Sequence, residues 1–177
     1  MKTTEKQLKT TLKQSENRKK QTENMGKEPF KNTEKQIPFE EIVELINKKC
    51  DYKFAVISEE IDDELMDKAR KEGIDLTGYK HVMETSGNSH SLRRHGNESN
   101  DRSPISVEDF LLIPYIIKYH DKVTIPKTKT RQHGLRTVIY RKTIGNVYFY
   151  VEEIRNGRNK SLAFHSFYKR PIKKASQ

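Results

Sequence analysis

Residues 146–155, NVYFYVEEIR, and residues 161–170, SLAFHSFYKR, decide the fold class of this chain. Both are rich in the β-branched and aromatic residues that strands favour. DKVTI (121–125) and LRTVIYRK (135–142) have the same character, and the turn-like segments TIGN (143–146) and NGRNK (156–160) are short enough for hairpins. The pattern predicts a roughly four-stranded antiparallel meander between about residues 120 and 170.

Helical patterns come before these strands. In IPFEEIVELINKKC (37–50), Pro38 suits a first helical turn and apolar residues follow at helical spacing. A second helix is expected after a cap at Ser58 and ends at Gly73, and a third begins near Ser106 and is interrupted by Pro114. Helices first and strands second predict an α+β domain, with N-terminal helices packed on the antiparallel sheet.

The domain is expected to begin after a long polar segment. Residues 1–36 hold few apolar residues and no sustained periodicity, which predicts a disordered or weakly helical basic linker. Residues 37–177 then form a single domain, with a helical part at 37–119 and a sheet part at 120–170. Cys50 is the one cysteine, and no apolar run approaches the roughly 20 residues that span a bilayer. We therefore expect no disulfide within a monomer, no membrane association and a cytoplasmic site of action.

The net charge of +10 is unevenly distributed. Residues 1–36 carry +5, residues 37–125 carry −6, and residues 126–177 carry +11 with only two acidic side chains. A basic C-terminal third among strand-like segments indicates a polyanionic partner, such as a nucleic acid.

The stretch NSHSLRRHGN (88–97) brings two histidines and two arginines together. If Asn88 or Ser89 caps a short helix, Gly96 is placed to end it in the left-handed conformation. His90 and His95 would then stand about 140° apart around the helix, whereas histidines that chelate one metal usually stand at i and i+4. Proton transfer is therefore favoured over metal binding, although His95 could simply be a cation at the helix C-terminus.

Six segments follow one another along the chain: GIDLTGYKHVME, HSLRRHG, ISVEDFLLIPYIIKYHDKV, VIYRKT, VYFYVEEIR and SLAFHSFYKR. In this order they resemble the phage-encoded nuclease domains grouped with barnase, EndoU, the colicin RNases and RelE. The resemblance runs from about residue 74 to 170. It implies a metal-independent endoribonuclease without cofactors, in which helices pack on a four-stranded antiparallel sheet. Ser166 stands where the family leads us to expect threonine, and it keeps the hydroxyl group.

Cleavage of RNA without a metal needs a base for the 2′-OH proton, an acid for the 5′-oxygen, and donors for the phosphoryl oxygens. The product is a 2′,3′-cyclic phosphate. His90 and His95 suit proton transfer, and strand alternation places Ser166 beside Tyr168, as in the colicin D nuclease. The resemblance favours Glu152 as the carboxylate. The basic residues expected to bind the substrate are Arg93, Arg94, Arg141, Arg155 and Lys169.

Two alternatives remain open, one for the site and one for the function. If the sheet is turned the other way, His165 with Glu153 and Arg155 would form a set like that of barnase. His81 and His133 lie in loop-like surroundings and are expected to be solvated. The chain could also be a non-catalytic module that binds nucleic acid or a phage capsid. As an enzyme, its expected partners are RNA, such as tRNA, and a cognate inhibitor or immunity protein, and it would act as a toxin or be delivered with phage.

Overall fold

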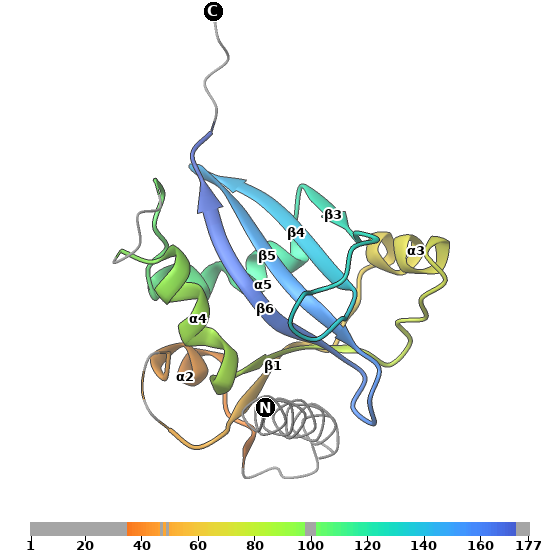
Figure 1. The fold of residues 1–177 in the computed structure, drawn as a ribbon, viewed down its shortest axis with the longest axis horizontal. Coiled ribbons are helices and arrows are strands. Elements are labelled where there is room, and N and C mark those ends of the chain that lie inside the picture. Colours follow the sequence, from red (N-terminus) through yellow and green to blue (C-terminus); the bar gives the residue numbers. More distant parts are fainter. Residues whose placement is uncertain (1–34, 47, 49, 98–101, 173–177) are drawn as a thin grey trace, which may run out of the picture.

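The computed structural model describes residues 35–172 apart from 47, 49 and 98–101; for residues 86–90 it describes the backbone alone. The strands are β1 (Phe54–Ser58), β2 (Lys80–Glu84), β3 (Lys122–Thr124), β4 (Thr137–Ile144), β5 (Asn146–Arg155) and β6 (Ser161–Arg170). The helices are α2 (Phe39–Glu44), α3 (Asp63–Lys71), α4 (Thr85–His95), the 3₁₀ helix η2 (Glu108–Leu112) and α5 (Ile113–Lys118). Figure 1 shows the helices around one curved sheet.

The sheet has six strands in the order β1-β2-β6-β5-β4-β3. The expected meander is present, because β3, β4, β5 and β6 pair antiparallel in sequence order. The expectation of four antiparallel strands was wrong for the whole sheet, since β2 pairs parallel to β6 and β1 pairs antiparallel to β2. β1 and β2 have five residues each and lie among helical segments, so neither forms a long alternating pattern.

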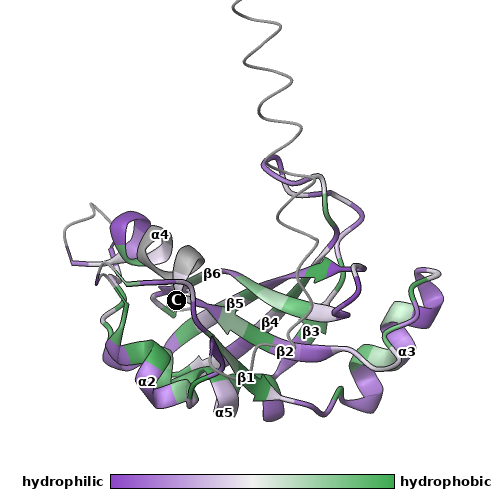
Figure 2. Ribbon diagram, turned by 90° about the horizontal axis from the view of Figure 1, so that it is seen from below, coloured by the Kyte–Doolittle hydropathy of each residue, from purple (hydrophilic) through white to green (hydrophobic). Residues whose placement is uncertain are grey.

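One face of the sheet is covered by helices and forms the core. Figure 2 shows α2 and α5 on this side of the sheet, with α4 at the margin of the other side. The core includes Ile42 of α2, Leu65 of α3 and Ile116 of α5, and the strands contribute Tyr150 and Phe167. We call the opposite side, which carries Phe149, the open face.

The helix α4 is longer than expected. It begins at Thr85, directly after β2, and does not begin at Asn88 or Ser89. Gly96 has φ −84° and ψ −175°, so it does not take the left-handed conformation. A Cβ at Gly96 would stand 2.4 Å from the carbonyl oxygen of Leu92, and the Gly96 N–H donates to that oxygen at 2.7 Å. Glycine therefore suits this position because it has no Cβ to collide with the Leu92 carbonyl oxygen.

α4 covers the part of β6 that β2 leaves without a partner. β2 pairs with β6 only from Ser161 to Ala163, and α4 then packs against β6. The buried Ser91 hydroxyl accepts a hydrogen bond from the backbone N–H of Phe167 at 3.1 Å. Because a buried N–H without a partner is costly, Ser91 holds α4 against the strand edge.

Candidate active site on the open face of the sheet

The open face of β5 and β6 brings together the residues that carry nuclease-type chemistry. On β5, alternation places Phe149, Val151, Glu153 and Arg155 on this face, because Tyr148 and Tyr150 point into the core. On β6, Tyr168 stacks on Phe149, with ring centroids 5.0 Å apart. Ser166, two residues from Tyr168, lies on the same face.

A β-bulge at His165 adds another residue to this face. Val151 pairs with Ser166, and the next residue, Glu152, pairs with Phe164, so His165 is the extra residue of β6. Without the bulge, strict alternation would send His165 and Ser166 to opposite faces. From the sequence, the residues around His165 and those around Ser166 are alternative catalytic sets. The bulge places both sets on one face.

Glu153 is the centre of this arrangement. Its carboxylate oxygens lie 2.9 and 3.0 Å from Nδ1 of His133 and 3.3 Å from Nδ1 of His165. The Arg155 guanidinium lies 3.5 Å from the same carboxylate. We call Glu153, His133, His165 and Arg155 the Glu153 cluster. The Glu153 side chain is 1% exposed, whereas the two histidine side chains are 22% and 32% exposed.

The electrostatics of Glu153 follow from these contacts. Burial alone would raise the pKa of its carboxyl group. The hydrogen bonds from His165 and His133 and the charge on those rings outweigh burial and lower the Glu153 pKa to about 2. Glu153 therefore carries a negative charge at neutral pH, held next to two imidazoles.

Arg155 is positioned by a second carboxylate. Its Nη1 donates to both oxygens of Glu84, at 3.0 and 3.1 Å. Glu84 is the last residue of β2, so the strand that the sequence did not predict supports the cluster from the side. Half-buried Arg155 is oriented between two acidic groups, which limits its rotamers.

His133 comes from the segment between β3 and β4, which crosses in front of the strands in Figure 1. Hydrogen bonds within the segment shape it, because the Gly134 N–H donates to the Thr130 carbonyl at 2.9 Å and Gly134 has φ +66°. Arg136 donates to the Pro126 carbonyl at 2.8 Å and to Glu72 at 2.9 Å, which connects the segment to the residue after α3. His133 was expected to be solvated, but its ring contacts the buried Glu153 carboxylate and its side chain is only 22% exposed.

The arrangement of the cluster suits acid–base chemistry. A carboxylate at Nδ1 stabilises the tautomer that carries the proton on Nδ1, which leaves Nε2 as an acceptor in the neutral ring. Each ring can then take a proton at Nε2 as a base, or give one as an acid when protonated. One carboxylate thus orients two partly exposed imidazoles.

Glu152, the carboxylate favoured from the resemblance, lies on the other face. Its side chain is fully buried and accepts hydrogen bonds from Nδ1 of His81 at 2.9 Å and from the Tyr150 hydroxyl at 2.9 Å. Burial and the Glu152 charge raise the pKa of Tyr150. His81 is buried as well, contrary to the expectation of a solvated side chain. Glu153, and not Glu152, shares a face with Ser166 and Tyr168.

The histidines of α4 have different positions. The His95 ring lies 5.2 Å from the Tyr168 ring, so His95 borders the open face. His90 belongs to α4, but its side chain lies outside the described part of the structure. Arg93 and Arg94 are exposed on the same helix.

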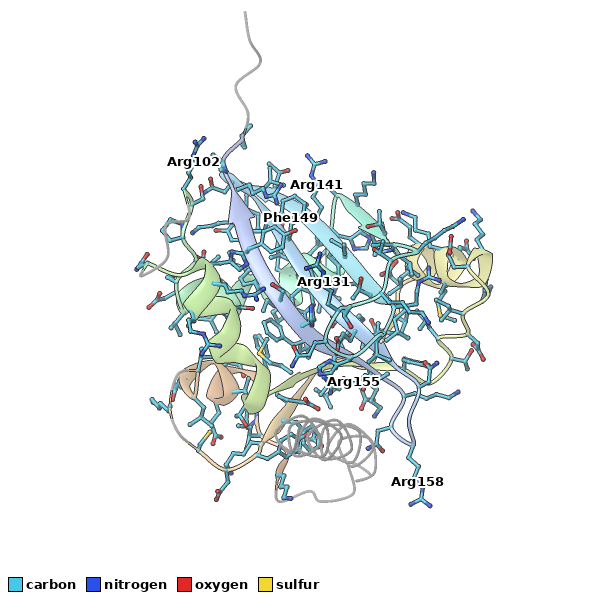
Figure 3. All side chains as sticks on the ribbon, viewed as in Figure 1. Arg102, Arg131, Arg141, Phe149, Arg155 and Arg158 are labelled. Carbon is cyan, nitrogen blue, oxygen red and sulfur yellow. The ribbon has the colours of Figure 1, made fainter. Side chains whose placement is uncertain are left out.

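The remaining predicted cations are divided between the two faces. Arg141 is the register partner of Phe149 on β4, and it is exposed. Figure 3 shows Arg141, Phe149, Arg131 and Arg155 following one another along the sheet. Lys169 instead bonds Asp109 at 2.8 Å and lies near the ring of core residue Tyr148, so it belongs to the helix-covered side.

Two other kinds of feature, a metal-binding group and a membrane-spanning helix, are absent from the described ranges. Among these residues, no three His, Cys, Asp or Glu side chains are grouped so that they could hold a metal ion. Within the same part of the chain, no helix is long and apolar enough to cross a membrane.

The contact between His133 and Glu153 is not predicted by the sequence pattern. One signal could have suggested its role: residues 126–177 contain only two acidic residues, Glu152 and Glu153, in adjacent positions. Each of these carboxylates binds a histidine that is distant in sequence. Glu152 contacts His81, and Glu153 contacts His133. A pair of acids in a strongly basic strand region is therefore a useful marker, although it does not identify the partners.

Comparison with known proteins gave one match. The model of the family described as "phage-Barnase-EndoU-ColicinE5/D-RelE like nuclease3" matches residues 55–177, which include all six strands except Phe54. No curated protein and no solved structure matched the chain.

Proposed function

The chain belongs to this family of phage-associated nucleases, and from that premise we propose that it is a metal-independent endoribonuclease. The observation that carries the proposal is the binding of two partly exposed imidazoles to the buried carboxylate of Glu153. This combination offers a base and an acid in one place, as cleavage through the substrate's own 2′-OH requires.

In the proposed reaction, one imidazole of the Glu153 cluster accepts the 2′-OH proton at Nε2. The 2′-oxygen attacks the phosphorus, the bond from phosphorus to the 5′-oxygen breaks, and the other imidazole, already protonated, donates its proton to that oxygen. The products are a 2′,3′-cyclic phosphate and a free 5′-OH. One proton enters and one leaves the His133–His165 pair, so Glu153 stabilises the same positive charge before and after the step.

Glu153 acts in this scheme as a positioning residue, because its carboxylate is buried and engaged by both rings. Arg155, on the same face, is a donor for the phosphoryl oxygens, and its planar fork suits that geometry. The Ser166 hydroxyl is a second donor, next to His165 in sequence.

A second assignment of the proton-transfer residues stays within the same function. His90 and His95 of α4 would work with Ser166 and Tyr168, as the sequence first suggested. The contact between the His95 and Tyr168 rings, at 5.2 Å, supports the presence of α4 beside the substrate. We propose the Glu153 cluster first because its groups contact one another directly.

The test of the function is cleavage of total tRNA by the purified chain in EDTA, with single-stranded DNA in a parallel reaction. We expect RNA fragments that end in 2′,3′-cyclic phosphate and intact DNA, because DNA lacks the attacking hydroxyl. RNA that remains intact but is bound would support the non-catalytic binding module instead. Cleavage of DNA, or RNA fragments with other ends, would contradict the proposed reaction.

A set of variants identifies the residues. His133→Asn and His165→Asn should each lower the rate at least about a hundredfold, within the range for a general acid or base. His120→Gln is the matched control, because His120 also contacts a carboxylate, Glu64 at 3.3 Å, but lies outside the site. If His90→Ala abolishes cleavage while both asparagine variants stay active and folded, the assignment moves to α4.

A further inference from the structure

A platform of aromatic rings lies on the open face beside the Glu153 cluster. Phe149 of β5 and Tyr168 of β6 are register partners, and their rings stack at 5.0 Å with 12° between the planes. The His95 ring of α4 lies 5.2 Å from Tyr168 and extends the row. We call Phe149, Tyr168 and His95 the ring platform.

The ring platform is not part of the core. The aromatic residues on the helix-covered face, such as Tyr148, Tyr150 and Phe167, are at most 6% exposed and belong to the core cluster. Phe149 and Tyr168 are outside that cluster, and both are partly exposed. Aromatic rings that do not fill the core have surface available for a ligand.

Cations surround the platform. The Arg170 guanidinium lies 5.6 Å from the Phe149 ring and 5.5 Å from the Tyr168 ring. Exposed Arg141 stands across from Phe149 on β4, and Figure 3 shows both at the same end of the sheet. Aromatic rings combined with arginine are the usual means of binding an unpaired base and its phosphate.

The platform and the cluster can contact one nucleic-acid strand. Phe149 precedes Glu153 by four residues on the same strand and the same face, which separates them by about 13 Å at 3.3 Å per residue. A single strand bound along β5 would pass both, since sites for single-stranded nucleic acid cover about 4 nucleotides or more.

We propose that the ring platform binds an unpaired nucleobase of the RNA, so that the substrate is a single-stranded or looped segment. This inference rests on the proposed ribonuclease function and adds its substrate class. A base inside a duplex has both faces covered by its neighbours, so it cannot stack on protein rings. The platform therefore favours loops and single strands over helical RNA.

The experiment measures binding without cleavage. A fluorescent 2′-O-methyl oligouridylate of about eight nucleotides has no free 2′-OH and covers a site of this kind. It is compared with an oligomer of equal length that carries the phosphates without bases, and with a duplex of the same length. The proteins are the full chain, Phe149→Leu, Tyr168→Phe and Tyr119→Leu. Tyr119 is the matched control, because its ring pairs with exposed Tyr115 at 5.0 Å and Lys118 lies over it at 5.4 Å, outside the platform.

Phe149→Leu should weaken binding of the single strand about fivefold to a hundredfold, the range for loss of one stacked base. It should leave binding of the baseless oligomer within about twofold, since no stacking is lost there. Tyr168→Phe keeps the ring and should bind like the wild type, as should Tyr119→Leu. The wild type should bind the single strand more tightly than the duplex.

The inference is overturned if Phe149→Leu weakens both oligomers equally, if Tyr119→Leu causes the same loss, or if the duplex binds as tightly as the single strand. These results leave the ribonuclease function standing when the wild type cleaves RNA. If the wild type neither binds nor cleaves RNA, the proposed function fails and this inference fails with it.

Discussion

Glu152 and Glu153 are neighbours in the chain and have opposite environments. Because successive strand residues point to opposite faces, Glu152 enters the core and Glu153 lies on the open face. Both are buried and both bind histidine. Only the partners of Glu153 are partly exposed, so only this carboxylate can orient groups that reach a substrate.

Ser166 should act on the phosphate and not as a covalent nucleophile, since attack by the 2′-OH makes a serine nucleophile unnecessary. Ser166→Ala should slow cleavage by roughly a hundredfold, the loss found for comparable oxyanion donors. Ser166→Thr keeps the hydroxyl and suits a strand, so it should remain active. Single-turnover rates and RNA affinity for both variants check this, and an alanine variant with the wild-type rate would remove Ser166 from the site.

Glu153 should also control stability in acid. Its folded pKa of about 2 lies below the usual 4.5, so the unfolded chain takes up the proton first as the pH falls. The stabilisation is complete above about pH 5 and is lost between about pH 5 and 2. It amounts to an order of 3 kcal/mol, from 1.36 kcal/mol per pKa unit.

The measurement is the free energy of unfolding by urea across this pH range, in the wild type and in Glu153→Gln. The variant should lose the part of the pH dependence that Glu153 contributes, about 3 kcal/mol. Asp121→Asn is the control, because Asp121 also has a pKa of about 2 but is 41% exposed, where solvent screens its interactions. An unchanged pH dependence in Glu153→Gln would contradict the assignment.

Two irregular elements create the site. The bulge in β6 turns His165 toward Glu153, and the segment between β3 and β4 brings His133 from the other side. The segment is held in part by Arg136, which donates to the Pro126 carbonyl and to Glu72.

Arg136→Gln should therefore lower the cleavage rate through His133. We expect a loss of about tenfold, since small displacements of a catalytic group are costly. The decisive measurement is the double variant: in a His133→Asn background, Arg136→Gln should cause little further loss, because the two residues act as one unit. Equal losses in both backgrounds would show that Arg136 acts independently of His133. Lys142→Gln, which removes an ion pair with Asp121, is the control.

At the scale of the whole molecule, the basic C-terminal part of the chain supplies cations to the open face. Residues 126–177 carry +11, and the exposed Arg131 and Arg141 lie on the open side with the cluster. Among the described residues, the first turns of α2, α3 and η2 each carry two acidic residues, such as Asp63 and Glu64 in α3. This separation gives a polyanion a preferred face.

The affinity for RNA should therefore fall as the salt concentration rises, mainly because of phosphate contacts made by the sheet. The logarithm of the binding constant should fall linearly with the logarithm of salt concentration, with a slope of about −0.7 for each phosphate contact on a single strand. Removing residues 1–36, which carry +5, should reduce this slope only in part. Titrations at several salt concentrations measure it, and a slope that vanishes on truncation would locate the binding surface in the N-terminal segment.

Local patterns were sufficient to predict the α+β class, the antiparallel meander from β3 to β6 and the helix that begins at Phe39, since periodicity and turn residues act over a few positions. Four features were not local. They are the pairing of β2 with β6, the bulge at His165, the burial of Glu152 with His81, and the contact of His133 with Glu153. Each depends on segments distant in sequence or on a one-residue shift in strand register. Such a shift exchanges the faces of every residue beyond it, and packing of the core selects which register is stable.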